Sequence, residues 1–289
     1  MHLFLWGEYL DMSFDFDDFE VRGRFYDIEE KTEVLRELMG TLYKEEQDDL
    51  HEAWAIAYIH HDCALDGTVL NHEELRPVCS RKVAQTPRAM NGVQLVRNHH
   101  ELLSQLLGQK SFASKGEALV LDVQALVDLN EAIMLNLPRK KPGQWRKEMP
   151  LHRTYFHTFM EPEEIQQGLE AVCRATTEEE FQSQHPVNQA ALFHHAFMQV
   201  FPFAEGTGTI GRHLMNSFLV RGGYDPCVIH ASDRQAYYEA LLHGPEGLRA
   251  LILDSLEAQL EAQIKYVKGL IREREKQNQR PNNYRGLAV

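Results

Sequence analysis

Cysteines are few in this chain, and acidic residues outnumber basic ones. The four cysteines are widely spaced and form no C-x-x-C pair, which argues against a cysteine zinc site or a disulfide framework. A reducing compartment, the cytoplasm, is therefore the expected location. Lys and Arg number 30 against 43 Asp and Glu, a formal net charge of −13 at pH 7. Because such a charge opposes nucleic-acid backbones and anionic membranes, we expect neither as a partner.

Long apolar runs and internal repeats are also missing. No stretch of about eighteen apolar residues could span a bilayer, and residues 1–6 lack the basic start of a signal peptide. Hydrophobic residues nevertheless make up 43% of the 289 residues, so the chain can bury a substantial core. We expect one large domain or two small ones.

Helical periodicity covers most of the chain. Apolar residues recur at intervals of three and four, which predicts helices over 28–40, 44–60, 94–107, 116–137, 187–201, 210–219 and 245–276. The last of these carries an apolar seam from Leu248 to Ile271, to be buried against the body or across a dimer. Residues 1–26 mix aromatic and acidic side chains and suggest short edge strands or a packed arm. Residues 277–289 are polar and are expected to fray.

The segment from Phe201 to Arg212, FPFAEGTGTIGR, joins two predicted helices. Pro202 ends the first helix, and the glycines that follow allow a tight loop before the second begins. The start of a helix directs unpaired N–H groups and a positive dipole at one point, which suits a phosphate. Glu205 could hold Mg²⁺, and Arg212 lies one turn into the second helix, within reach of a phosphate.

This segment resembles the motif His-Pro-Phe-x-Asp/Glu-Gly-Asn-Gly-Arg-x-x-Arg of the Fic (Fido) family of protein adenylyltransferases, and the resemblance extends from about Ala53 to Leu242. It implies an all-α Fic fold with a short β-hairpin flap. In the family the His deprotonates a hydroxyl of a target protein, the acidic residue carries Mg²⁺, and the loop and two Arg hold the phosphates of ATP. The usual outcome is transfer of AMP to the target.

Three motif positions differ in this chain. Phe201 stands where the family has its catalytic His, Thr207 where it has Asn, and Thr209 where it has the first Arg. Residues that agree with the motif are Pro202, Phe203, Glu205, Gly206, Gly208 and Arg212. General-base catalysis is worth about 10²–10⁴ in rate, and one stabilising donor about 10²–10³, so ordinary AMP transfer should be very slow.

The resemblance assigns roles to further residues. It implies an anion or nucleotide site formed by Gly206, Thr207, Gly208, Thr209 and Arg212, with Tyr237 or Tyr238 against the base, and a metal at Glu205. Trp145 and Arg146 would open the flap, near 143–159. Asp62 and Asp66 fall in a region, near 53–75, that resembles an inhibitory helix.

Several of these roles have plainer alternatives. Asp66 could pair with Arg212, or simply lie beside a helix C-cap glycine. Tyr237 and Tyr238 could be core residues, since most aromatic residues on helices are. By charge alone, the basic patch 139–146 would be a phosphate-facing or a solvated loop. The run His60 to Cys63 resembles metal ligands but fits a helix end better.

Two hypotheses follow for the function. The first is a binding or regulatory pseudoenzyme, with Mg²⁺ and ATP or another phosphorylated ligand bound weakly, a protein target or partner, and a homodimer as the expected assembly. The alternative is a Fic-fold enzyme with altered phosphate-ligand chemistry or residual nucleotidyl transfer to a protein hydroxyl. A replacement base could come from His194, His195 or His213. The expected division of the chain is an N-terminal arm and helices (1–52), a Fic-like domain (53–242), and a C-terminal helix with a frayed tail (243–289).

Overall fold

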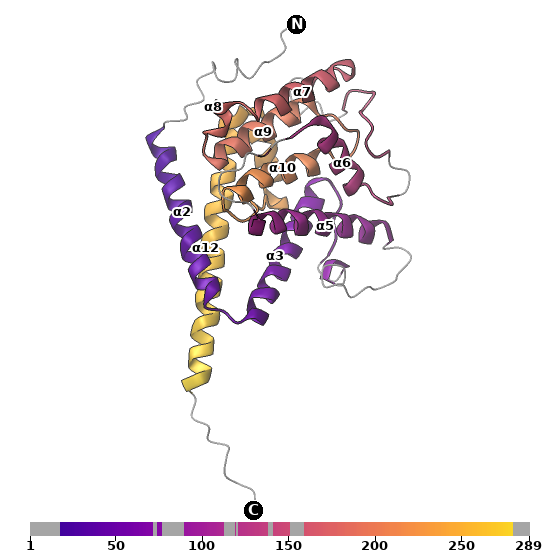
Figure 1. Ribbon diagram of the computed structural model, residues 1–289. Helices are drawn as coiled ribbons and strands as arrows, with labels where there is room; N and C mark the ends of the chain where they lie inside the picture. Colours follow the sequence, from indigo (N-terminus) through magenta and orange to yellow (C-terminus); the bar gives the residue numbers. More distant parts are fainter. Residues whose placement is uncertain are drawn as a thin grey trace, which may run out of the picture.

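A computed structural model describes residues 18–71, 74–76, 90–112, 119, 121–137, 141–150 and 159–279. The helices of this part of the chain are α2 (Phe19–Gly40), α3 (Lys44–Leu65), α5 (Met90–Phe112), α6 (Val123–Ile133), α7 (Ile165–Ala175), α8 (Glu179–Gln182), α9 (Pro186–Val200), α10 (Thr207–Arg221), α11 (Arg234–Leu242) and α12 (Gly244–Gln279) (Figure 1). Short 3₁₀ turns precede α7 (Pro162–Glu164) and α11 (Ala231–Asp233). The predicted all-α class is confirmed. None of the described helices is long and apolar enough to cross a membrane.

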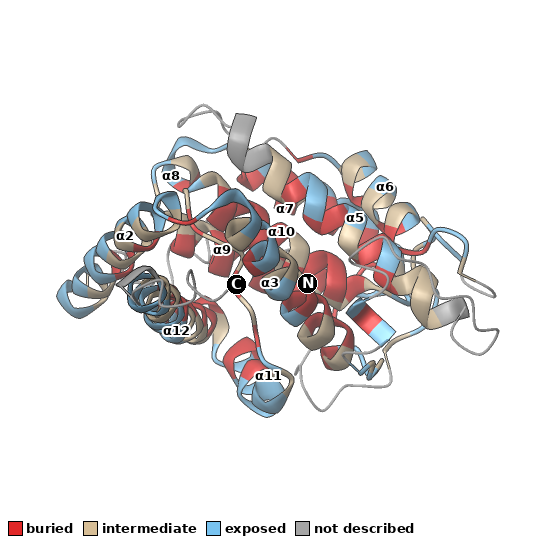
Figure 2. Ribbon diagram, turned by 90° about the horizontal axis from the view of Figure 1, so that it is seen from below, coloured by how far each residue is buried: buried red, intermediate tan, exposed pale blue. Residues whose placement is uncertain are grey.

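Helices α9 and α10 form the centre of the core. They pack against each other and are joined only by residues 201–206. Both are buried over most of their surface, whereas the outer helices expose one face (Figure 2). Phe193 and Phe197 of α9 are fully buried, and Phe193 packs on Phe218 of α10. The loop between these helices is therefore held on a rigid pair.

The apolar seam of α12 is buried within the chain. Leu248, Leu256 and Val267 are at most 1% exposed, and α12 packs on α2, α9 and α11. Figure 1 shows α2 and α12 running side by side. Arg24 of α2 pairs with Glu257 of α12 at 2.7 Å, a partly exposed contact that adds little stability. Of the two modes of burial left open by the sequence, the structure has the one within the chain, so the seam no longer supports a homodimer.

We expect Leu256→Ala to lower the free energy of unfolding by about 2–5 kcal/mol in urea denaturation, because it leaves a cavity under α12. Leu242→Ala is the matched control, since Leu242 is 38% exposed at the end of α11. It should change stability by about 0.5 kcal/mol or less. Equal effects of the two substitutions would contradict burial of the seam.

Two predicted boundaries are wrong, both because a side chain caps a helix. Residues 19–26 are helical and not strands, since Asp18 Oδ1 accepts a hydrogen bond from the Glu20 N–H at 2.8 Å and starts α2 there. The helix predicted over 116–137 spans only Val123–Ile133, since Asp122 caps it through the Ala125 N–H at 2.7 Å. Residues 1–17 lie outside the described part.

The structure describes only part of the predicted flap, and one proposed domain boundary falls within a helix. Within 141–150 the structure has one isolated antiparallel bridge, Trp145 to Phe203, and residues 151–158 of the expected hairpin lie outside the described residues. The proposed 52/53 boundary falls inside α3, so a division there would cut a continuous helix. Helix α12 continues to Gln279, three residues into the segment expected to fray.

Candidate functional site

The loop between α9 and α10 is shaped by its backbone. Phe201 ends α9 in the left-handed conformation, with φ 46°, and its N–H donates to the Phe197 carbonyl at 3.0 Å. Gly206 precedes α10 with φ 78°, a conformation that favours glycine. The Thr207 hydroxyl closes the loop, accepting from the Phe203 N–H at 3.0 Å and donating to the Phe203 carbonyl at 2.9 Å. The start of α10 is thereby fixed, with Thr207 buried inside the turn.

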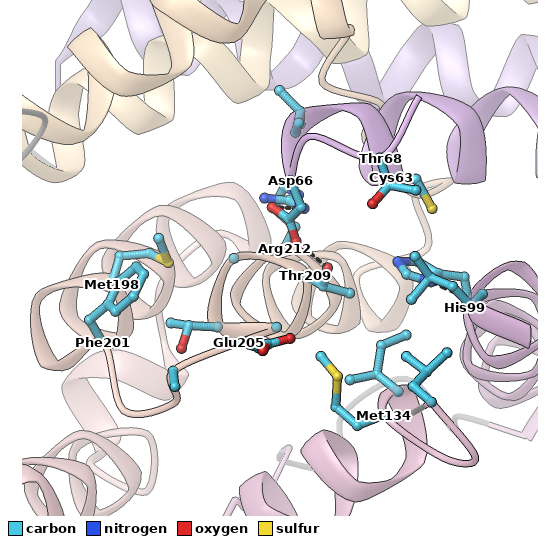
Figure 3. A pocket seen from close by; sticks show the side chains of 18 of the residues that line it. Cys63, Asp66, Thr68, His99, Met134, Met198, Phe201, Glu205, Thr209 and Arg212 are labelled. Atoms are coloured by element: carbon cyan, nitrogen blue, oxygen red, sulfur yellow. Dashed lines mark hydrogen bonds and ion pairs between the residues drawn. The ribbon is translucent and has the colours of Figure 1, made fainter. Parts of the chain in front are cut away.

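Arg212 of α10 is held by two carboxylates from α3. Its Nε lies 2.5 Å from Asp62 Oδ1, and its Nη2 lies 3.2 Å from the Asp62 carbonyl. The same Nη2 lies 3.0 Å from Asp66 Oδ1, and Figure 3 shows Asp66 beside Arg212. Arg212 and Asp62 are 3% and 5% exposed. Burial lowers the pKa of Arg212, but the two carboxylates raise it well above the ordinary value. Of the two alternatives for Asp66, the pairing with Arg212 is present. Asp62, which the sequence placed in the same inhibitory-helix-like region without a partner, is the more buried of the two carboxylates.

Asp66 also covers the beginning of α10. The Thr209 hydroxyl donates to Asp66 Oδ2 at 2.5 Å. A Cβ atom on Gly208 would lie 2.9 Å from Asp66 Oδ1, so the carboxylate approaches the backbone as closely as a glycine permits. Asp66 thus brings a negative charge to the N-terminal turn of α10, where the sequence predicted a bound anion.

His99 of α5 completes this group and was not found by sequence reasoning. Its Nε2 lies 3.1 Å from Asp62 Oδ2, and its Nδ1 lies 2.9 Å from the Leu95 carbonyl. Burial lowers the pKa of His99, but Cys63 and Asp62 raise it well above the usual value, so both ring nitrogens carry protons. Burial likewise raises the pKa of Asp62, but Arg212 and His99 lower it to about 2. No spacing in the sequence links a histidine of α5 to α3.

A cavity of about 550 Å³ lies beside this group. Its polar lining residues include Asp66, Glu205, Thr209, Arg212 and Arg234. Its apolar lining residues include Ile133, Met134, Leu137, Phe159, Met198 and Phe201, of which Met134, Met198 and Phe201 are labelled in Figure 3. The Phe201 ring packs on Phe159 with ring centroids 5.1 Å apart. The cavity can therefore contact both polar and apolar groups of a ligand.

Tyr237 and Tyr238 both line the cavity but differ in burial. Tyr237 is 1% exposed, and its hydroxyl lies 2.8 Å from His194 Nε2, as in a packed core residue. Tyr238 is half-buried, with Arg234 5.6 Å from its ring centroid. Of the two, Tyr238 has the more accessible ring for a flat ligand.

The interpretation of Arg146 from charge alone, as a phosphate-facing or solvated residue, is wrong. Arg146 is 4% exposed and donates to the carbonyls of Phe201 at 2.7 Å, Val200 at 3.2 Å and Met160. It therefore caps the C-terminal end of α9 from beneath the loop, because the last carbonyls of a helix need donors. Its neighbour Trp145 packs on Phe203, with ring centroids 5.0 Å apart. Neither residue lines the cavity within the described part.

The expected substitute bases also lie elsewhere. His194, His195 and His213 are absent from the described lining of the cavity. Burial lowers the pKa of His194 to about 3 and that of His195 to about 4, so both are neutral side chains of the core. Among the residues that the structure describes, no group of three or more His, Cys, Asp or Glu side chains is placed to hold a metal.

Comparison with known proteins agrees with this geometry. The chain matches the Fic/DOC family over residues 120–219. Over 193 residues, or 66% of this chain, it is 26% identical to "Protein adenylyltransferase Fic" of Drosophila erecta and 27% identical to that of Drosophila mojavensis. The match spans only 37% and 36% of the length of those relatives.

Solved structures show the same fold. A Fic-domain signalling protein from Bacteroides thetaiotaomicron is similar with a TM-score of 0.69 and 19% identity, covering 84% of this chain and 97% of that one. Fic-1 from C. elegans is similar with a TM-score of 0.68 and 18% identity, covering 84% and 71%. The family match contains α9, the loop and most of α10, so the helix pair that carries the loop is the part of this chain that is similar to the Fic/DOC family.

Proposed function

We propose that this Fic-domain protein is a binding or regulatory protein that does not transfer AMP and whose anion site is held closed by its own carboxylates. One observation carries the proposal: Arg212 is bonded by both Asp62 and Asp66. Arg212 stands at the one arginine position of the motif that this chain keeps, and its charge is already paired with two carboxylates. A phosphate would have to displace Asp66 in order to reach it.

The side chain at position 201 supports the same conclusion. The motif resemblance places a catalytic base there, and the left-handed backbone of Phe201 is more often adopted by His, Asn or Asp than by a bulky apolar residue. Phe201 can neither accept nor donate a proton, and its ring belongs to the apolar wall with Phe159 and Met198. His99, which lines the cavity, is already protonated and bound to Asp62. It is therefore unsuited to act as a general base.

A weak anion site is nevertheless compatible with the residues present. The backbone of Gly206, Thr207 and Gly208 lines the cavity at the start of α10. Glu205 is exposed there, and one carboxylate together with ligand phosphate oxygens is a donor set that Mg²⁺ accepts. Thr209 supplies a neutral hydroxyl where a second guanidinium would bind a phosphate. We therefore expect ATP or another phosphorylated ligand to bind weakly, with Tyr238 against an aromatic base.

Closure of the anion site by Asp66 can be tested by removing the Asp66 carboxylate. We expect Asp66→Ala to bind ATP and Mg²⁺ about tenfold to a hundredfold more tightly than wild type in calorimetric titration, because it frees a charge-assisted hydrogen bond of about 1.5–3 kcal/mol. Asp254→Ala, which removes the same charge from an exposed site on α12, should leave the affinity unchanged. Adding Arg212→Ala to Asp66→Ala should abolish the gain.

Other outcomes would separate the remaining possibilities. An Asp66→Ala variant that binds no better than wild type would show that Asp66 does not close the site. Absence of binding by every nucleotide, sugar nucleotide and phosphorylated metabolite tested would refute the retained anion site. Tight binding of one ligand other than ATP, lost on Arg212→Ala, would favour an enzyme of altered chemistry. A protein partner and a homodimer remain proposals, for pull-down and light-scattering experiments.

A further inference from the structure

A second cavity, of about 870 Å³, lies on another face of α3 and shares no lining residue with the Arg212 site. Helices α3, α5 and α12 and the 225–230 segment form its walls; α3 and α12 can be followed in Figure 1. Its volume falls within the range of small-molecule sites. Nothing in the Fic motif or in the proposed function uses it.

The walls of this second cavity are aromatic and apolar. Trp54 and Tyr58 of α3 face it together with Tyr266 of α12, which is 57% exposed. Ala258 and Ala262 lie one turn apart on α12 and line it as well, so their small side chains leave room between the helices. A flat apolar molecule fits such walls, because aromatic rings stack on flat partners.

Gln263 gives this cavity an unused hydrogen-bonding group. Its side chain lines the cavity and is 7% exposed, and its Oε1 has no hydrogen-bond partner. Buried polar atoms are almost always paired, so an unpaired amide oxygen in a residue of the cavity wall indicates a missing donor. The neighbouring Gln259 is not such a group, because it bonds the Val228 N–H at 3.2 Å and the Pro226 carbonyl at 3.1 Å.

The charges of the lining exclude anionic ligands. Among the described residues that line this cavity, none is Lys or Arg, and Asp225 is acidic. His61 Nδ1 accepts from the Ala231 N–H at 3.2 Å. Burial and the neighbouring His230 and His60 lower the pKa of His61 to about 4, so it is neutral at pH 7. A phosphate or carboxylate would therefore find no Lys or Arg among the described residues of this lining.

We propose that this cavity binds a neutral, planar aromatic molecule that donates a hydrogen bond to Gln263. Three probes on one ring system test the proposal: naphthol, which is neutral and has a donor; methoxynaphthalene, which is neutral and has none; and naphthoate, which is anionic. Binding to the full chain is followed by calorimetry. We expect saturable binding of naphthol, several-fold weaker binding of methoxynaphthalene, and at least tenfold weaker binding of naphthoate.

Variants locate the binding. Ala262→Trp should fill the cavity and abolish naphthol binding, whereas Ala250→Trp, at an exposed position of the same helix outside the lining, should not. Gln263→Met keeps the volume and removes an amide whose oxygen has no partner, so the fold should tolerate it. In that variant, naphthol should bind no better than methoxynaphthalene does.

Four results would overturn the proposal. They are absence of saturable naphthol binding to folded wild type, naphthol binding that survives Ala262→Trp, naphthoate binding as tight as that of naphthol, and naphthol binding that Gln263→Met leaves unchanged. A wild-type dimer in light scattering that Ala262→Trp dissociates would instead assign this surface to a second copy of the chain. That result also counts against a small-molecule site.

Discussion

Wild-type protein incubated with labelled ATP and Mg²⁺ should label neither itself nor the proteins of a lysate at a rate typical of a Fic adenylyltransferase. Phe201 removes a general base, worth about 10²–10⁴ in rate. Thr209 removes a phosphate contact worth about 10²–10³, and its hydroxyl already donates to Asp66. Since the two losses concern different tasks, their effects should largely multiply.

Repair of one position should not restore labelling. Phe201→His supplies a base at a backbone conformation that His tolerates, but Arg212 stays bonded to Asp62 and Asp66 in that variant. We expect a rise of about a hundredfold or more only when Phe201→His is combined with Thr209→Arg and Asp66→Ala. Glu205→Ala in the combined variant is the control and should return labelling to background, because Glu205 would hold the metal.

Labelling by the wild-type protein would contradict this prediction. Strong Mg²⁺-dependent labelling by wild type that disappears on Glu205→Ala would show that the protein transfers AMP without a histidine at position 201. Substitution of His99, the one histidine among the described residues of the cavity wall, would then test whether it gives up its proton and takes the role of the base.

Arg212→Met should destabilise the protein by about 3–5 kcal/mol in urea denaturation, the largest effect that we expect from any single substitution outside the apolar core. The reason is that the buried carboxylate of Asp62 then keeps only His99 as a cationic partner. Arg212→Met with Asp62→Asn should be more stable than Arg212→Met alone, since the amide carries no charge and can still accept a hydrogen bond from His99. If the double variant is the less stable of the two, the cost does not come from the stranded charge.

Lowering the pH should reduce the difference in the free energy of unfolding between wild type and Arg212→Met. In wild type the pKa of Asp62 is lowered from 3.8 to about 2, so the stability that its charge contributes is complete above about pH 4 and is lost as the pH falls toward 2. In the variant, Asp62 keeps only His99 as a cationic partner, so its pKa lies higher than in wild type and protonation removes the cost of its buried charge at a higher pH. Leu256→Ala changes only apolar contacts, so the difference between its free energy of unfolding and that of wild type should not vary with pH.

Local sequence determined the helices and the position of the loop. The spacing of apolar residues predicted α3, α5, α9, α10 and α12, and Gly40 marked the end of α2. Pro202 and Gly206 marked the limits of the 201–206 loop. These features could be predicted because helical periodicity, fixed proline geometry and glycine freedom act over one or two turns of chain. Asp18 and Asp122 shifted two helix starts by the same kind of local bond, which periodicity alone does not show.

The tertiary structure decided which residues meet. Asp62 and Arg212 are 150 residues apart, and His99 reaches Asp62 from a third helix. By charge alone Arg146 was expected to face a phosphate or solvent, yet it caps α9 across more than fifty positions. The seam of α12 could have met another chain but meets α2, α9 and α11. Such contacts depend on which helix faces are brought together when the whole core packs, and no pattern within one helix specifies its partner.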